Sequence, residues 1–338
     1  MELLDDVVRA LDALDTRAGA LGRQLEVDGP ALLRERADIL EIAPEGTRSA
    51  GGTCRLLPAS DGYWVAINLA RQDDVEALAA WVGHELDRPT WDAVADHLVW
   101  TPAELAVERA QLLGIPAAVA GEPHRLRAVA EVRDVSRASV TDTPRVLDLS
   151  SLWAGPLCAR LLGQLGANVV KAESPDRPDG ARGGPPEFWA RLNGGKVERT
   201  MDFDDIRRFI ERADVVVTSA RRRAIEQREL DLEHEVRSRG LIWVAITGYG
   251  YFGEWSDRVA FGDDAAVAGG LAVYAGGVDA PVFVGDAPAD PMAGLQGAAT
   301  ATALLQAGRG GMVDVSMREA VAAALREDAR YPAEEEVA

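Results

Sequence analysis

The chain has 338 residues, of which 47% are apolar, so it is long enough to form two units with separate cores. Its 36 Lys and Arg stand against 55 Asp and Glu, and the net charge of -19 opposes a nucleic-acid partner, because phosphate contacts need a basic face. The two cysteines lie far apart, so we expect no metal site. The acidic N-terminus has no signal-peptide pattern and no apolar run approaches the roughly 18 residues of a membrane span, so we expect a soluble, cytoplasmic protein with no membrane partner.

The first part of the chain predicts a small α+β domain over residues 1–125. Apolar residues recur at helical spacing through most of it, with a break at Asp28-Gly29-Pro30. Residues 52–70 differ, because they are rich in β-formers on both sides of a turn and predict a hairpin. The mixed charged stretch 126–142 predicts a linker to the next domain.

Residues 143–330 alternate between strand and helix patterns and predict a larger α/β domain. Short apolar strands are expected at residues 145–149, 167–173, 213–217 and 241–247, with helices at 155–165, 206–212 and 225–239. Such an alternation implies right-handed crossovers and a Rossmann-like, mostly parallel sheet. Ligands of these sheets bind at the carboxyl ends of the strands, so we expect the functional site there.

A series of short motifs in this part resembles family III CoA-transferases. They are, in order, VLDLSSLWAGP at 146–156, LGANVVKAE at 165–173, NGGK at 193–196, ADVVV at 213–217, TGYGYFG at 247–253 and VDVSMREA at 313–320. The resemblance implies acyl-CoA and carboxylic acid substrates, coenzyme A as a substrate with no permanently bound cofactor, and a homodimer. Residues 61–67 and 112–118 resemble the family's smaller domain, which normally follows the larger one. The order therefore resembles a circular permutation, or one half of a duplicated fusion.

The resemblance also implies a catalytic aspartate. In this family an Asp carboxylate attacks the acyl-CoA thioester to give a mixed anhydride; CoA thiolate then returns to form an aspartyl thioester, which an acceptor acid resolves. The motif places this residue at Asp290, ahead of an Ala-rich helix expected over residues 292–305. Two alternatives stay open: Asp290 followed by Pro291 is also a favoured helix N-cap pair, and Asp286 is a nearby competitor.

Racemization of an acyl-CoA is a second enzymatic alternative. Racemases that resemble this chain carry a His in the segment that matches residues 258–264, and no His stands there. The resemblance therefore favours the transferase, unless a carboxylate such as Asp263 replaces the histidine.

Several positions are candidates for contact with coenzyme A. Glycines allow the backbone to approach a ligand, arginines bind phosphate and a carboxylate at a strand end accepts from a ribose hydroxyl. The candidates are Ala154, Gly155, Glu173, Arg182, Arg221, Gly248, Tyr249 and Gly250. The arginine run at 221–223 is equally typical of a solvated face, and Ser219-Ala220 replaces the Asn-aromatic pair that normally precedes the family's arginine.

Two further alternatives stay open at this stage. A permuted relative that binds CoA or a partner chain without catalysis fits the altered motifs. A dinucleotide dehydrogenase fits less well, because the first strand-to-helix turn lacks GxGxxG.

Overall fold

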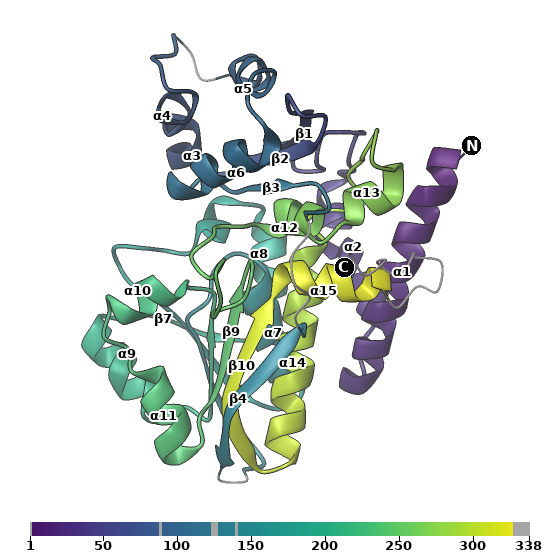
Figure 1. The fold of residues 1–338 in the computed structure, drawn as a ribbon. Helices are drawn as coiled ribbons and strands as arrows, with labels where there is room; N and C mark the ends of the chain where they lie inside the picture. Colours follow the sequence, from purple (N-terminus) through teal and green to yellow (C-terminus); the bar gives the residue numbers. More distant parts are fainter. Residues whose placement is uncertain (1, 88–89, 123–127, 139–140, 327–338) are drawn as a thin grey trace, which may run out of the picture.

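The structure is a computed structural model that describes residues 2–87, 90–122, 128–138 and 141–326. A seven-stranded, mostly parallel sheet carries helices on both faces, and a three-stranded antiparallel sheet lies above it (Figure 1). The predicted α/β class with a mostly parallel sheet and a smaller α+β part is therefore confirmed. In the described part of the chain, no helix is long and apolar enough to cross a membrane.

The large sheet has the strand order β4-β10-β9-β8-β5-β6-β7. Its strands are β4 (Ala130–Arg137), β5 (Arg145–Asp148), β6 (Asn168–Glu173), β7 (Val197–Thr200), β8 (Val215–Thr218), β9 (Ile242–Thr247) and β10 (Arg309–Ser316). Only the pairing of β4 with β10 is antiparallel. The predicted strands at β5, β6, β8 and β9 are confirmed, whereas β4 lies within the expected linker.

Successive side chains of the central strands point to opposite faces of the sheet, and helices cover the apolar side chains on each face. Val215 and Val217 belong to the apolar cluster of one face, with α7 (Ala154–Gln164) and α14 (Ala289–Gln306). Val216 belongs to the cluster of the opposite face. That face is covered by α9 (Phe203–Ile210), α10 (Arg222–Glu226) and α11 (Leu232–Arg239). The single helix predicted at 225–239 is wrong, because a turn with Glu229 in a left-handed conformation (φ 51°) separates α10 from α11.

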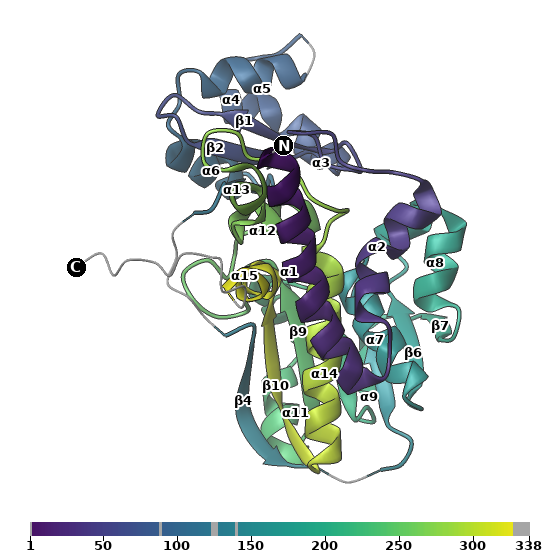
Figure 2. The same ribbon diagram turned by 90° about the vertical axis from the view of Figure 1, so that its right-hand side faces the viewer.

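The first two helices pack against the large sheet's helical layer. They are α1 (Glu2–Leu25) and α2 (Gly29–Leu40), and the predicted break between them is confirmed, with the Asp28 carboxylate accepting from Ala31 N at 3.0 Å. Leu14 and Leu21 of α1 are buried in the cluster that holds α7 and α14, and Figure 2 shows α1 running along α14. The expected small domain over residues 1–125 includes these two helices, because an apolar stripe predicts a buried face but not the partner of that face.

The small sheet has its own core. Its strands are β1 (Cys54–Pro58), β2 (Trp64–Asn68) and β3 (Ala117–Val119), which confirms the predicted hairpin. The helices beside it are α3 (Gln72–Glu76), α4 (Leu78–Val82), α5 (Trp91–Leu98) and α6 (Ala103–Leu112). Val65, Ile67 and Trp81 are fully buried within this cluster.

One short helix connects the two sheets. α12 (Gly262–Ala268) follows the loop after β9 and lies under the small sheet, where Val267 packs with Leu56 and Ala66. The remaining helices are α8 (Pro186–Asn193), α13 (Leu271–Gly276), α15 (Met317–Arg326) and the 3-10 turn Gly180–Gly183. The small sheet thus covers the carboxyl ends of the large sheet's strands, where the site is expected.

Candidate active site

Asp290 lies where the N-termini of α7, α12 and α14 come together. It is the second residue of α14, whose N-cap is Pro288, so the interpretation of Asp290 as the cap of its own helix is wrong. Its Oδ1 accepts a hydrogen bond from the backbone N–H of Ala154, the first residue of α7, at 3.3 Å. A side chain at Gly262, which opens α12, would collide with Oδ2 of Asp290. The carboxylate therefore accepts a hydrogen bond at the N-terminus of a neighbouring helix, where negative charge is stabilised.

The surroundings of Asp290 bring its titration close to neutral pH. Burial, as the largest effect, raises the pKa of the Asp290 carboxyl to about 7, and repulsion from Asp263 and Asp286 raises it further. The Arg36 guanidinium and the Ala154 N–H act in the opposite direction and lower it. Asp290 as a whole residue is half-buried. A buried carboxyl whose pKa is shifted this far by specific neighbouring charges is typical of a reacting group.

Asp263, Asp286 and Asp290 form an acidic cluster with Arg36. Arg36 donates to both oxygens of Asp286, at 2.7 Å from Nε and 2.6 Å from Nη2, and the Asp286 side chain is fully buried. Asp263 accepts from Ala287 N at 3.0 Å, and burial, followed by repulsion from Asp286, raises its pKa to about 6. Arg36 was missed by the sequence analysis, because a helical arginine carries no sign of a partner 250 residues away.

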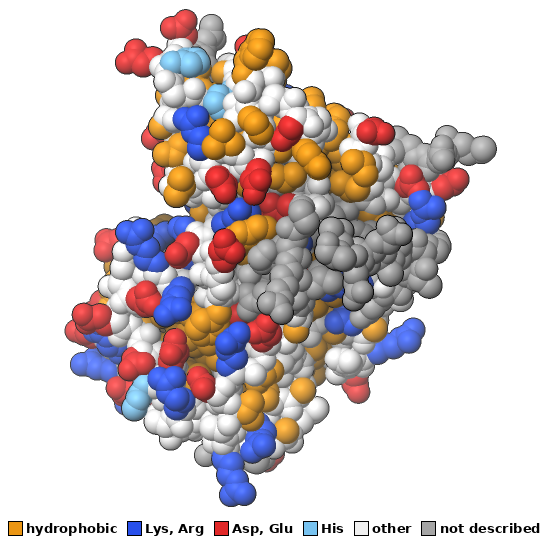
Figure 3. Space-filling model, in the orientation of Figure 1, with side chains coloured by type: hydrophobic (Ala, Val, Ile, Leu, Met, Phe, Trp, Pro, Cys, Tyr) orange, Lys and Arg blue, Asp and Glu red, His pale blue; other side chains and the backbone are white. Residues whose placement is uncertain are grey.

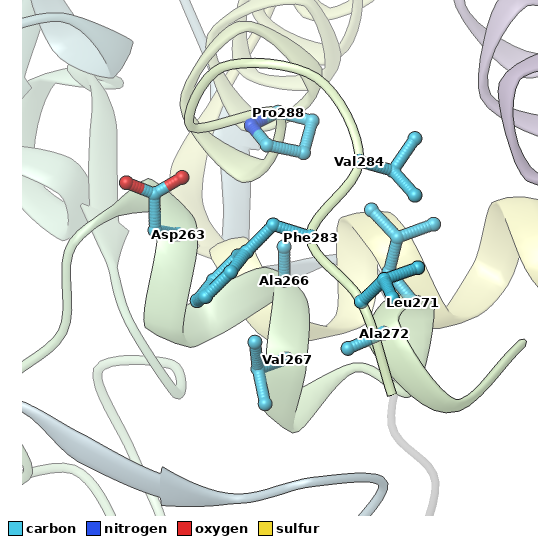
Figure 4. A pocket seen from close by; sticks show the side chains of 9 residues that line it. Asp263, Ala266, Val267, Leu271, Ala272, Phe283, Val284 and Pro288 are labelled. Carbon is cyan, nitrogen blue, oxygen red and sulfur yellow. The ribbon is translucent and has the colours of Figure 1, made fainter. Parts of the chain in front are cut away.

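A small cavity adjoins the cluster on the side of Asp263. Its other lining residues are apolar and come from α12, α13 and the segment before α14, as Figure 4 shows. The volume is about 10 Å³, near the lower limit for one water molecule. This cavity is therefore too small for an acyl group.

The glycine loop after β9 packs inside the protein. A side chain at Gly248 would place its Cβ 2.6 Å from that of Ala260, and the Gly248 carbonyl accepts from Arg318 N at 3.0 Å. Tyr249 is 5% exposed, and its ring lies edge-on to Trp255 at 5.5 Å. Gly250 is buried as well, with φ 92°. The glycines of this loop allow its backbone to lie close to a neighbour, and the neighbours are other segments of the same protein.

The structure separates the remaining candidates for CoA contact into three groups, which lie at or after the ends of β5, β6 and β8. Ala154 bonds Asp290, and Gly155 packs against Ser150, where an added side chain would collide. Arg182 donates to Glu173 from Nη2 at 2.6 Å, and it stacks on Trp189 with its guanidinium 4.1 Å from the ring centre. Both charges of this pair are thus already balanced.

Burial acts to raise the pKa of Glu173, but hydrogen bonds from Arg182 and from the Asp179 N–H outweigh it and lower that pKa. The carboxylate therefore stays ionised without a ligand.

Arg221 lies in a basic cluster after the carboxyl end of β8. Burial lowers the pKa of its guanidinium, and so does repulsion from Arg71, Arg223 and Arg177, against the raising effect of Asp257. Arg71 is itself paired with Asp74. All four side chains are exposed. Figure 3 shows acidic and basic side chains mixed over one face of this acidic protein, so a group of arginines around Arg221 is a local exception. Such a group favours an anionic ligand.

Comparison with known proteins places the chain in a family. The sequence description of CoA-transferase family III matches residues 142–337, and the chain belongs to this family. A succinyl-CoA–D-citramalate CoA-transferase of Chloroflexus aurantiacus is 29% identical over 201 residues, which cover 54% of this chain and 50% of the relative. The β subunit of a succinyl-CoA–L-malate CoA-transferase of the same organism is 32% identical over 198 residues, covering 52% and 49%.

A solved structure supports the same assignment. A CAIB/BAIF family protein from Brucella suis is 25% identical and superimposes with a TM-score of 0.50 over 57% of each chain. The chain spans about half the length of the curated relatives it matches.

Proposed function

We propose that this protein transfers coenzyme A between an acyl-CoA thioester and a small carboxylic acid, with Asp290 as nucleophile. The observation that carries the proposal is the Asp290 carboxylate itself: it is bonded to a helix N-terminus, its pKa is raised to about 7, and it stands in the motif that resembles the family's nucleophile. The two named relatives act on succinyl-CoA with citramalate or malate, so we extend the proposal to hydroxylated dicarboxylic acids as acceptors.

The proposed exchange conserves the thioester bond energy in covalent intermediates. The Asp290 carboxylate attacks the thioester carbonyl, the C–S bond breaks and CoA leaves as thiolate, so a mixed anhydride joins the acyl group to the enzyme. The thiolate then attacks the Asp290 carbonyl, releases the acyl group as a carboxylate and leaves an aspartyl thioester. An acceptor carboxylate then attacks the aspartyl thioester, releases CoA thiolate and forms a mixed anhydride with Asp290. The thiolate attacks the acceptor carbonyl of this anhydride, so the acceptor departs as its CoA ester and the Asp290 carboxylate is restored.

The surroundings of Asp263 support transfer over racemization. A general base needs a free lone pair directed at the substrate. The Asp263 side chain is 6% exposed, and its carboxylate is already bonded to Ala287 N and to the Ser49 side chain. These contacts engage it within the protein, so it is poorly placed to replace the absent histidine.

The proposal is tested by incubating the protein with succinyl-CoA and a panel of acceptor acids, including citramalate and malate, and separating the CoA esters by chromatography. We expect a new CoA ester to form in proportion to the succinyl-CoA consumed. Incorporation of deuterium at the α-carbon without an acceptor acid would support a racemase. Failure of calorimetry to detect CoA or acyl-CoA binding would contradict both enzymatic functions and leave a relative that binds other partners.

We also propose that the basic cluster binds phosphate groups of CoA. Arg221→Ala is expected to weaken CoA binding by about tenfold, because one charge-assisted hydrogen bond to phosphate contributes roughly 1.5 to 3 kcal/mol. Calorimetry with CoA and with dephospho-CoA measures the effect. An equal loss with both ligands indicates contact with the diphosphate, and a loss confined to CoA indicates contact with the 3′-phosphate.

Arg208→Ala is the matched control, since it removes the same charge from an exposed arginine that pairs only locally, with Asp205 at 3.1 Å. Equal weakening by both variants would show that overall charge, and not the cluster, governs CoA affinity.

The homodimer, the cytoplasmic location and the division into domains at 1–125 and 143–330 stay predictions. Sedimentation analysis of the purified chain measures the first of these directly.

A further inference from the structure

Arg36 links the N-terminal helices to the acidic cluster around Asp290. It lies on α2, outside the residues that match the family. Its guanidinium forms two parallel hydrogen bonds with Asp286, at 2.6 and 2.7 Å, a geometry that fixes direction as well as charge. Its Cζ also lies 5.2 Å from the ring centre of Trp153, the residue before the Ala154 N–H that bonds Asp290.

The partner of Arg36 belongs to the turn that leads into α14 and sets the position of Asp290. Ala287, next to Asp286, has φ 44°, a left-handed conformation that side-chain-bearing residues rarely adopt. Its N–H donates to Asp263 at 3.0 Å, and its carbonyl accepts from Asp290 N at 3.0 Å. Such a conformation persists only where the surroundings hold it, and the Arg36–Asp286 pair is one of the contacts that do so.

The charges around Asp290 also depend on Arg36. Asp263 approaches from α12 and Asp286 from the turn before α14, and both repel a negative charge on Asp290. The Ala154 N–H of α7 and the Arg36 guanidinium of α2 attract it, and of these two Arg36 has the larger effect. Carboxylates that share a buried site cannot all ionise without a compensating positive charge.

We infer that Arg36 is a positioning residue for Asp290: it holds the turn at Asp286 and supplies the positive charge that lets Asp290 react as a carboxylate. The inference rests on the proposed function, in which Asp290 is the nucleophile. It extends the site to a helix that precedes the family-matched region, so α2 would contribute to the reaction as well as to the fold.

The test follows the titration of Asp290 in the whole chain by NMR of protein labelled with carbon-13 at the aspartate carboxyls. Asp290→Asn identifies the resonance. Arg36→Gln is expected to raise the titration midpoint of Asp290 by about one pH unit or more, whereas Arg36→Lys, which keeps the charge, should raise it less. In the exchange assay, Arg36→Gln should move the rising limb of the kcat profile to higher pH by the same amount.

Glu35→Gln is the matched control. Glu35 is the neighbour of Arg36 on α2 and pairs with Arg160 at 2.8 Å, so its replacement disturbs the same helix without touching the acidic cluster. We expect an unchanged Asp290 titration in this variant. A folded Arg36→Gln protein with an unchanged midpoint would overturn the inference and leave Arg36 a structural residue.

Two safeguards separate the outcomes. If Arg36→Gln does not fold, the double variant Arg36→Gln/Asp286→Asn removes both charges of the Arg36–Asp286 pair. It should still raise the midpoint, because the effect of Arg36 on Asp290 exceeds that of Asp286. If the wild-type chain shows no exchange, the proposed function fails, while the titration still reports whether Arg36 controls the ionisation of Asp290.

Discussion

Replacing Asp290 by asparagine is expected to reduce CoA exchange by about 1,000-fold or more, because an amide oxygen cannot attack a thioester and form an anhydride. Asp290→Ala should give the same loss and guards against slow deamidation of asparagine back to aspartate. The loss should appear in kcat, with CoA binding retained, because the basic cluster around Arg221 is a separate group of residues. Steady-state exchange assays and calorimetry measure the two effects.

Two observations make the Asp290 experiment specific. Hydroxylamine added during turnover should convert Asp290 of the wild-type protein into a hydroxamate, which peptide mass spectrometry locates. Asp214→Asn is the matched control: Asp214 pairs with Arg145 at 3.0 Å, in front of β8 and at the opposite end of the sheet from the site, and its loss should leave exchange unchanged. Exchange at the wild-type rate in Asp290→Asn would refute the proposed mechanism.

The second large effect concerns stability against pH. Burial raises the pKa of Asp264 to about 8 and that of Asp290 to about 7 in the folded protein. A carboxyl whose pKa is raised in the folded protein binds its proton more tightly there than in the unfolded chain. The proton therefore stabilises the folded state fully below the unfolded pKa, and this contribution is lost as the pH rises through the folded pKa. We expect the free energy of unfolding to fall by roughly 3 kcal/mol between about pH 6 and about pH 9 from Asp264 alone. Urea unfolding at several pH values measures it.

Asp264→Asn isolates this contribution. The asparagine keeps an oxygen that can accept from Asn68 Nδ2 and Phe261 N, which the carboxylate oxygen contacts at 2.9 and 3.1 Å. The variant should lose most of the pH dependence and exceed the wild type in stability at alkaline pH. Burial lowers the pKa of His97, so this residue makes the folded protein more stable as the pH rises, which is opposite to the effect of Asp264. Because His97 is present in both proteins, its contribution cancels when their pH curves are compared. Parallel pH curves for the two proteins would contradict a neutral, buried Asp264.

Strands whose residues are buried on both faces were predictable from the sequence alone. Val215–Thr218 and Ile242–Thr247 are continuous apolar runs because helices cover both sides of them, and this pattern has no other common cause in a chain with alternating helices. The edge strands escaped prediction. Val197–Thr200 is exposed along its whole length, and Ala130–Arg137 is largely exposed and charged, so neither carries the apolar signal of a strand.

The candidate nucleophile was likewise predictable, but its surroundings were not. A local motif identified Asp290, because a motif depends only on residues that are neighbours in the sequence. The motif was consistent with a helix cap, and only the position of Ala154 N shows that this carboxylate meets the terminus of a different helix. The sequence offers Asp286 as a competitor of Asp290 and Asp263 as a substitute for the histidine of a racemase, yet the fold assembles all three into one cluster with Arg36.

The sequence by itself determined the α/β class, the four buried strands and the place of Asp290 in a family motif, because periodicity and short motifs depend on neighbours along the chain. Only the tertiary structure decided that α1 and α2 pack on the large sheet, that Glu173 and Arg182 neutralise each other, and that Arg36 stands beside the acidic cluster. Pairing, burial and pKa depend on groups brought together from distant parts of the chain, and no local pattern records those partners.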